Sequence, residues 1–100
     1  MKIEVLYFEG CPNYLPAIDR LRSVLRQEGL AAEVSEIEVK DASAAKAWNF
    51  FGSPTIRING LDIDAEARTV TKTGFACRRY SGGLPSPEMI RAALREAREG

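Results

Sequence analysis

Histidine is absent from this chain, and cysteine is scarce, with two residues at positions 11 and 77. Without histidine, neither thiol can work with an imidazole base, so a cysteine–histidine catalytic pair is excluded. Two thiols alone also cannot supply the four ligands of a structural zinc site on one chain. Nucleophilic or soft-metal chemistry in this protein therefore rests on one or two thiols, and no cofactor or resident metal is expected.

A surplus of positive charge is also missing, because fourteen Lys and Arg residues balance fourteen Asp and Glu residues. Nucleic-acid and membrane binding usually show a basic surplus or stripe, so neither partner is expected. The adjacent Arg78 and Arg79 are expected to lie on a solvated strand face. No run approaches the roughly 20 apolar residues of a membrane helix, and the alternating start of the chain is a poor signal peptide. We expect a cytoplasmic protein, where cysteines are usually reduced or redox-active.

One hundred residues, 45% of them apolar, suit a single globular domain over residues 1–100. The hydrophobic pattern predicts strands at 2–8, 32–40, around 55–58 and at 75–80, and helices at 14–28, 42–51 and 87–98. Residues 61–74 fit either a hairpin arm or an ordered loop. Candidate helix caps are Asn13, Asp41 and Ser86 at the starts and Gly29 at an end, while Leu15, Ile18, Leu21, Leu25, Trp48 and Phe51 are expected in the core.

This order of elements, β-α-β-α-β-β-α, predicts an α/β fold. A helix joins the first two strands, which implies a parallel, right-handed crossover. Asn59-Gly60 is a strong type I′ turn signal, so the last two strands are expected to be antiparallel. The sequence thus predicts a mixed four-stranded sheet with helices on both faces.

Three stretches of this sequence resemble the thioredoxin-like family. "FEGCPNY" is similar to the family's active-site loop, with Cys11 as the reactive cysteine, and "GSPT" is similar to its cis-proline loop, with Pro54 in that role. "YSGGLPSPEMI" resembles the glycine turn before the last helix. The likeness covers nearly the whole chain and is strongest to small single-domain bacterial proteins with a GCP-type motif. It implies a three-layer α/β/α fold and substrate binding by residues Pro12, Tyr14, Ser53, Pro54 and Gly82.

The departure from the family pattern is at position 14, where Tyr14 stands in place of the resolving cysteine. Exchange between two cysteines within this loop is therefore excluded. The Tyr14 side chain could supply a hydroxyl to the sulfur of Cys11 or fill the space of the lost cysteine. Cys77 is a candidate to replace the resolving thiol, although a thiol in the middle of a strand is by default a buried apolar residue.

Cys11 is expected to be a partly exposed thiol at the start of a helix. The free N–H groups and positive dipole end of a helix N-terminus stabilise a thiolate, whereas a nearby Glu9 charge would oppose it. The alternative interpretation is a buried cysteine that acts as a small apolar side chain. The cis form of the Ser53–Pro54 bond would leave the Ser53 backbone free to pair with an extended peptide opposite Cys11.

Three functions remain open from the sequence. The first is a thiol–disulfide oxidoreductase that forms mixed disulfides through Cys11, with a protein disulfide or a small thiol such as glutathione as its partner. The second is a thiolate site for soft ions such as mercury or arsenic, in which Asp62 and Asp64 are proton-donor candidates only by elimination. The third is a non-catalytic binding module that keeps the fold.

Overall fold

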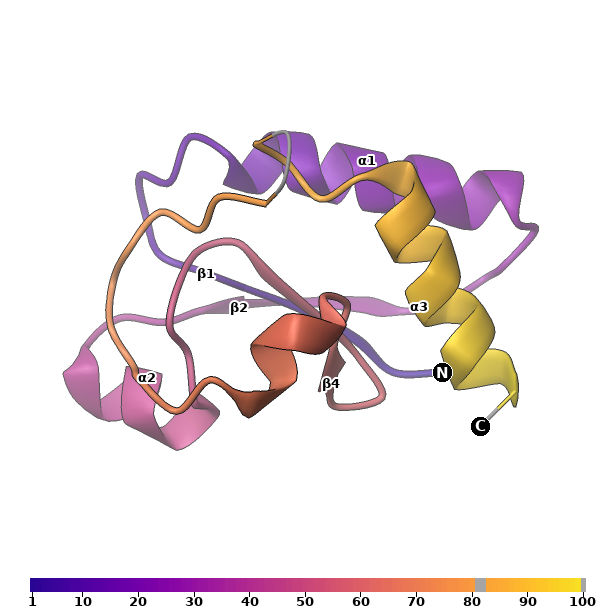
Figure 1. Ribbon diagram of the computed structural model, residues 1–100. Helices are drawn as coiled ribbons and strands as arrows, with labels where there is room; N and C mark the ends of the chain where they lie inside the picture. The colour runs from indigo at the N-terminus through magenta and orange to yellow at the C-terminus, as the bar shows by residue number, and fades with distance from the viewer. Residues whose placement is uncertain (81–82, 100) are drawn as a thin grey trace.

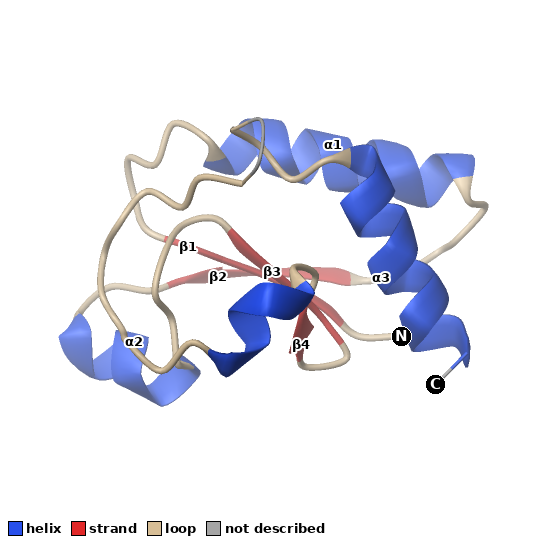
Figure 2. Ribbon diagram, in the orientation of Figure 1, coloured by secondary structure: helices blue, strands red, loops and turns tan. Residues whose placement is uncertain are grey.

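The computed structural model describes residues 1–80 and 83–99 as a four-stranded mixed sheet with three α-helices (Figure 1, Figure 2). The α/β class and the mixed four-stranded sheet predicted from the sequence are confirmed. The strands are β1 (Ile3–Tyr7), β2 (Val34–Glu38), β3 (Thr55–Ile58) and β4 (Leu61–Asp62), the α-helices are α1 (Tyr14–Gln27), α2 (Ala42–Trp48) and α3 (Pro87–Glu99), and a 3-10 helix, η1, covers Ala65–Thr69.

The strands lie in the order β2-β1-β3-β4. β1 and β2 are parallel and are joined through α1, as the hydrophobic pattern predicted. β3 runs antiparallel to β1, and β4 runs antiparallel to β3. The turn between β3 and β4 is the predicted one, because Asn59 and Gly60 have φ values of 52° and 84°, both positive as a type I′ turn requires.

The prediction of a last strand at 75–80 beside β3 is wrong. The tight Asn59-Gly60 turn returns the chain at once, so that β4 takes the place beside Arg57 and Ile58. Residues 75–80 instead make isolated bridges, one of them parallel between Ser53 and Cys77. The segment 61–74 begins as a short hairpin arm, since β4 pairs antiparallel with β3, and continues through η1.

The helix ends follow the predicted caps with one exception. The side chains of Asp41 and Ser86 accept hydrogen bonds from backbone N–H groups in the first turns of α2 and α3, at 2.8 and 3.0 Å. Gly29 follows the C-cap of α1 with a φ of 66°. Asn13 is the N-cap residue of α1, but its side chain makes no capping hydrogen bond.

One face of the sheet packs against α1 and α3. Strand side chains such as Ile3, Val5 and Ile56 form the main hydrophobic core with the buried stripe of α1 centred on Leu21. The prediction that Leu15 belongs to this stripe is wrong, since its side chain is 65% exposed. At about 100° per residue, Leu15 lies about 120° around the helix from Leu21 and therefore points away from the sheet.

The opposite face carries a smaller core of Leu6, Val39, Ala45 and Phe50. The prediction that Trp48 and Phe51 are core residues is wrong, because Trp48 is 36% exposed and Phe51 is only half-buried. The helix ends at Trp48 and Asn49 adopts a left-handed conformation, with a φ of 52°. This break in the helical spacing turns Phe50 inward instead.

Candidate functional site

Cys11 lies in the loop between β1 and α1. Its backbone N–H donates a hydrogen bond to the carbonyl oxygen of Phe8, at 3.3 Å, and its own carbonyl accepts one from Tyr14, at 3.4 Å. Cys11 is a free thiol and only 8% exposed, so the expectation of a partly exposed thiol is wrong. The ring of Phe75 contacts that of Phe8 edge-on, with 6.2 Å between centroids, so a distant segment packs on this loop.

Two neighbours of Cys11, Pro12 and Tyr14, were expected to bind substrate. Pro12 is exposed. The ring of Tyr14 stacks on Tyr7 with 3.7 Å between centroids, and its hydroxyl donates to the carboxylate of Glu36 on β2. Burial and this hydrogen bond raise the pKa of Tyr14 above its ordinary value. The hydroxyl therefore belongs to a contact between α1 and β2 and is not supplied to the sulfur of Cys11.

Ser53 and Pro54 lie buried just before β3, and the peptide bond between them is cis. The Ser53 hydroxyl oxygen accepts a hydrogen bond from the backbone N–H of Phe8, at 3.4 Å, which joins the start of β3 to the Cys11 loop. The Ser53 backbone is not free, contrary to expectation. Its N–H donates to the carbonyl of Ala76 at 2.9 Å, and its carbonyl accepts from the N–H of Arg78 at 2.8 Å.

We call residues 74–80 the strap. In Figure 1 this orange segment runs along one end of the molecule, from beside α2 to the start of α1. Besides its two hydrogen bonds to Ser53, the strap is attached at each end, by Gly74 N–H to the Phe50 carbonyl at 3.1 Å and by the Tyr80 hydroxyl to the Pro54 carbonyl at 2.8 Å. It therefore follows the edge that was expected to receive a substrate peptide.

Gly52 shows how closely the strap approaches the backbone that precedes β3. A Cβ atom at this position would lie 3.0 Å from the Cβ of Arg78 and 3.3 Å from the carbonyl oxygen of Ala76. Real Cβ atoms rarely have contacts this short, so glycine gives the strap room to pair with the next residue, Ser53.

Arg78 is the anchor of the strap, and the prediction of a solvated side chain is wrong for it. It is 7% exposed, whereas Arg79 is exposed. Its guanidinium group makes two hydrogen bonds to the carboxylate of Asp62, at 2.7 and 2.8 Å, and lies 4.8 and 4.4 Å from the ring centroids of Phe51 and Tyr80. Burial alone would lower the pKa of Arg78, but the hydrogen bonds with Asp62 raise it above its ordinary value.

Sequence reasoning missed the Arg78–Asp62 pair, and no local signal could have found it, since sixteen residues separate the partners. The pair also bears on the proton-donor role that was considered for Asp62 and Asp64. Both carboxylate oxygens of Asp62 accept from Arg78, and Asp64 lies 3.9 Å from the same guanidinium group. These carboxylates hold the strap in place.

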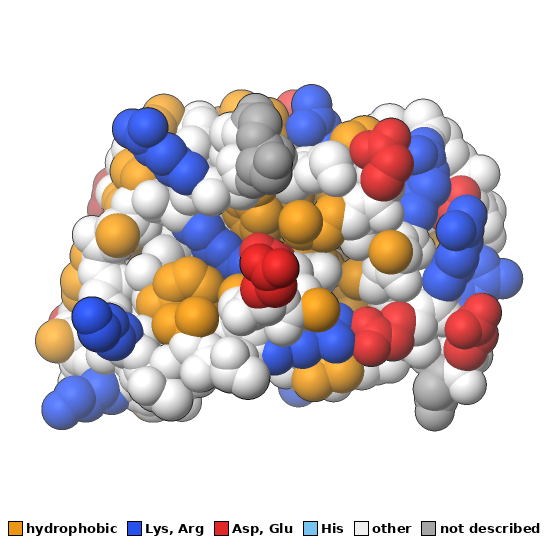
Figure 3. Space-filling view, viewed as in Figure 1, with side chains coloured by type: hydrophobic (Ala, Val, Ile, Leu, Met, Phe, Trp, Pro, Cys, Tyr) orange, Lys and Arg blue, Asp and Glu red, His pale blue; other side chains and the backbone are white. Residues whose placement is uncertain are grey.

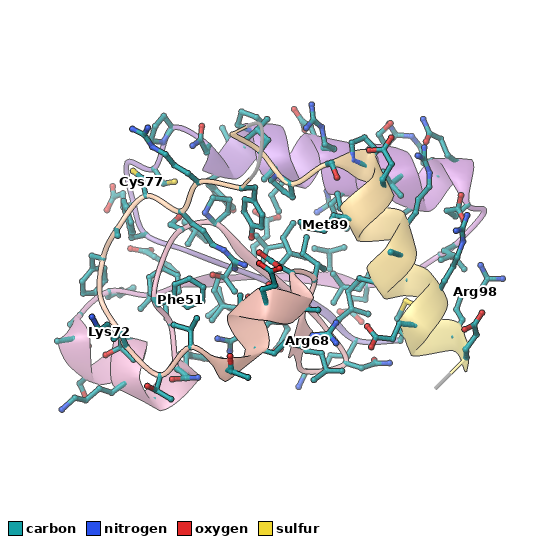
Figure 4. The ribbon with its side chains drawn as sticks, viewed as in Figure 1. Phe51, Arg68, Lys72, Cys77, Met89 and Arg98 are labelled. Atoms are coloured by element: carbon teal, nitrogen blue, oxygen red, sulfur yellow. The ribbon has the colours of Figure 1, made fainter. Side chains whose placement is uncertain are left out.

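Cys77, which was expected to be buried, is an exposed free thiol on the strap. It lines a pocket of about 380 Å³ together with residues that include Phe51, Val70 and Arg79. Figure 4 shows Cys77 and Phe51 at the same end of the molecule, away from Arg98 on α3. On this face, hydrophobic side chains are exposed between basic and acidic ones (Figure 3).

A chain of backbone and side-chain contacts thus connects the strap, which carries Cys77, to the loop that holds Cys11. Cys77 pairs with Ser53, Ser53 bonds to Phe8, and Phe8 bonds to Cys11 through its carbonyl. Gly82, the remaining predicted binding residue, lies outside the described residues.

Comparisons with protein-family models, with curated proteins and with solved structures found no match for this chain. Within residues 1–80 and 83–99, no group of three or more His, Cys, Asp or Glu side chains is arranged to hold a metal ion. None of the helices described is long and apolar enough to cross a bilayer.

Proposed function

We propose that this protein carries out thiol–disulfide exchange with Cys77 and Cys11 acting as a pair. The observation that carries the proposal is the pairing of exposed Cys77 with Ser53, whose hydroxyl in turn bonds to the loop that holds Cys11. Cys77 then makes the first attack on the substrate, and Cys11 acts as the resolving cysteine, so that the pair does not need a cysteine at position 14. This scheme differs from exchange through Cys11 alone, because the more exposed of the two thiols lies on the strap.

The exchange has two steps. The thiolate of Cys77 attacks a disulfide R–S–S–R, forming a Cys77–S–S–R bond and releasing one thiolate, RS⁻. The thiolate of Cys11 then attacks the sulfur of Cys77, so that a Cys11–Cys77 disulfide forms and the second RS⁻ leaves. The protein loses two electrons to the disulfide, and the protons of its two thiols pass to the released thiolates. The reverse sequence reduces the protein with small thiols.

A thioredoxin-like fold is part of this proposal. It is supported by the parallel β1-α1-β2 unit, the antiparallel β3 that begins after a cis proline, and the position of Cys11 before α1. The structure departs from the likeness in the strap and in the two-residue β4. These departures give the site its second thiol.

A soft-metal site is the second candidate, and the same pairing of Cys77 and Ser53 favours it. Two thiolates suit a linear soft ion such as Hg²⁺. Cleavage of a carbon–mercury bond is not proposed, since Asp62 is already paired with Arg78. Reaction of the metal-free protein with a small disulfide separates the two candidates, because an exchange protein forms the Cys11–Cys77 disulfide and releases two thiols, whereas a site that only binds metal leaves the disulfide unreacted.

The test uses bis(2-hydroxyethyl) disulfide and the reduced protein, with Cys11→Ser and Cys77→Ser as variants. We expect the wild-type protein to end as an intramolecular disulfide with no adduct. Cys11→Ser should accumulate an adduct of one 2-mercaptoethanol at Cys77, and Cys77→Ser should react much more slowly. A wild-type protein that stays reduced, or that keeps a stable adduct, contradicts the paired mechanism. The first result would identify a non-catalytic binding module, and the second a single-thiol protein.

A further inference from the structure

Resting on the proposed function, we infer that the strap restricts this site to small disulfides. It does so by occupying the backbone N–H and C=O groups of Ser53 and Pro54, which we call the Ser53 edge, so that an extended polypeptide cannot pair with them. Arg78 is the positioning residue that keeps the edge closed. The inference starts from the backbone groups of Ser53 and from the anchoring of the strap.

An added peptide strand is recognised through free backbone N–H and C=O groups at an edge. Ser53 offers one N–H group, and Ala76 already accepts its hydrogen bond. The Ser53 carbonyl already accepts from Arg78, and the Pro54 carbonyl accepts from the hydroxyl of Tyr80. Because proline has no N–H group, no free donor remains on this two-residue edge. An outside polypeptide must therefore displace the strap before it can pair here.

Arg78 makes this displacement difficult. Its side chain is buried against Asp62, Thr55 and two aromatic rings, so lifting the strap would separate an ion pair and leave the Asp62 carboxylate buried without its partner. A buried charge that loses its partner is strongly destabilising. The strap therefore stays seated while the Cys77 thiol remains exposed.

A small disulfide needs neither the Ser53 backbone nor movement of the strap. The pocket beside Cys77 has a volume of about 380 Å³, within the range that binds small molecules. Phe51 and Val70 give this pocket apolar surface, and Arg79 and Glu66 give it charged groups. A small disulfide can reach the sulfur of Cys77 from this side with the edge still closed.

The experiment compares two substrates that release the same thiol. One is bis(2-hydroxyethyl) disulfide, and the other is a synthetic extended peptide whose central cysteine is joined to 2-mercaptoethanol. We expect the wild-type protein to react with the peptide at least about tenfold more slowly, a difference in barrier of about 1.4 kcal/mol. The double variant Asp62→Leu with Arg78→Met removes the anchor without leaving a buried charge, and its two rates should become similar.

Arg98→Gln is the matched control, because this arginine is exposed on α3, away from the strap and its pocket (Figure 4), and the selectivity of this variant should equal that of the wild-type protein. Equal rates for both substrates in the wild-type protein overturn the inference, as does a double variant that keeps the wild-type selectivity. Amide hydrogen exchange at positions 53 and 78 provides a second readout, which should be slow in the wild-type protein and fast in the double variant.

The two readouts also separate failure of the inference from failure of the proposed function. A protein that reacts with neither substrate contradicts the proposed exchange. Closure of the edge is then judged from hydrogen exchange alone, and fast exchange at Ser53 in the wild-type protein overturns it.

Discussion

The two faces of the sheet are held together in different ways. The face against α1 and α3 is apolar, with strand residues such as Val5 and Ile56 packed on two amphipathic helices. The other face presents Thr55 and Arg57 beside a small apolar cluster, and its cover is completed by the strap through Arg78. One face is held mainly by apolar contacts, and the other combines a small apolar cluster with hydrogen bonds and an ion pair between distant segments.

This difference separates the apolar face, which stabilises the fold, from the region that holds the two thiols of the proposed exchange reaction. Both thiols lie near the strap, in the part of the structure that one anchor positions. A substitution in the apolar face should therefore lower stability without changing how the site selects its substrates. A substitution at the anchor should change both.

The largest expected effect is that of Arg78→Leu. Removing the cation leaves Asp62 buried and unpaired, so we expect a loss of about 3–5 kcal/mol in the free energy of unfolding, measured by urea denaturation. Arg79→Leu is the control, and it should change stability by no more than about 0.5 kcal/mol because the side chain is exposed. Equal losses in the two variants would contradict the anchoring role of Arg78.

Leu21→Ala tests the apolar face. Leu21 is fully buried in the main core, and truncation of such a side chain costs about 2–5 kcal/mol. Urea denaturation should show this loss, whereas the ratio of rates with the small disulfide and the peptide disulfide should stay as in the wild-type protein. A changed ratio would mean that the two faces are not independent.

The double variant Asp62→Leu with Arg78→Met should lose far less stability than Arg78→Leu alone. Replacing both members of a buried ion pair by apolar side chains is often close to neutral, because no uncompensated charge remains. The free energies of unfolding of the single and double variants make this comparison directly. If the double variant is as unstable as the single one, packing by the Arg78 side chain matters more than charge pairing.

The smallest expected effect on stability is that of Glu96→Gln. The carboxylate of Glu96 on α3 accepts two hydrogen bonds from Arg68 on η1, at 2.7 and 3.0 Å. These hydrogen bonds lower the pKa of Glu96 below 4.5, the ordinary value for a glutamate carboxyl group. The pair therefore contributes stability above that pH, and the contribution is lost as the pH falls through the lower, folded-state pKa. Thermal unfolding of the wild-type protein and of Glu96→Gln should differ slightly at pH 6 and converge in acid; a constant difference would contradict the assignment.

The apolar face could be predicted from the sequence because its signals are local. Helical spacing predicted the stripe of α1 around Leu21, and the capping residue Ser86 predicted the start of α3. The Asn59-Gly60 turn was also correct, since two positive φ values suit few other residue pairs.

The strap could not be predicted because its contacts are distant in the sequence. Cys77 and Arg78 have the alternating pattern of an ordinary strand, and only the contact with Asp62 makes Arg78 a buried residue. Cys77, the residue before it, is exposed and Cys11 is buried, which is the reverse of the expected exposure of the two thiols. Local pattern thus located Cys11 and Pro54, but not the segment that lies across them.

The most direct test of the paired thiols is a map of disulfides in the oxidised protein. After reaction with bis(2-hydroxyethyl) disulfide and blocking of free thiols, trypsin places the two cysteines in separate peptides, residues 3–20 and 73–78. The paired mechanism predicts that these two peptides are recovered joined by one disulfide, from monomeric protein. Recovery of both peptides unlinked, each blocked or each carrying 2-mercaptoethanol, would contradict it.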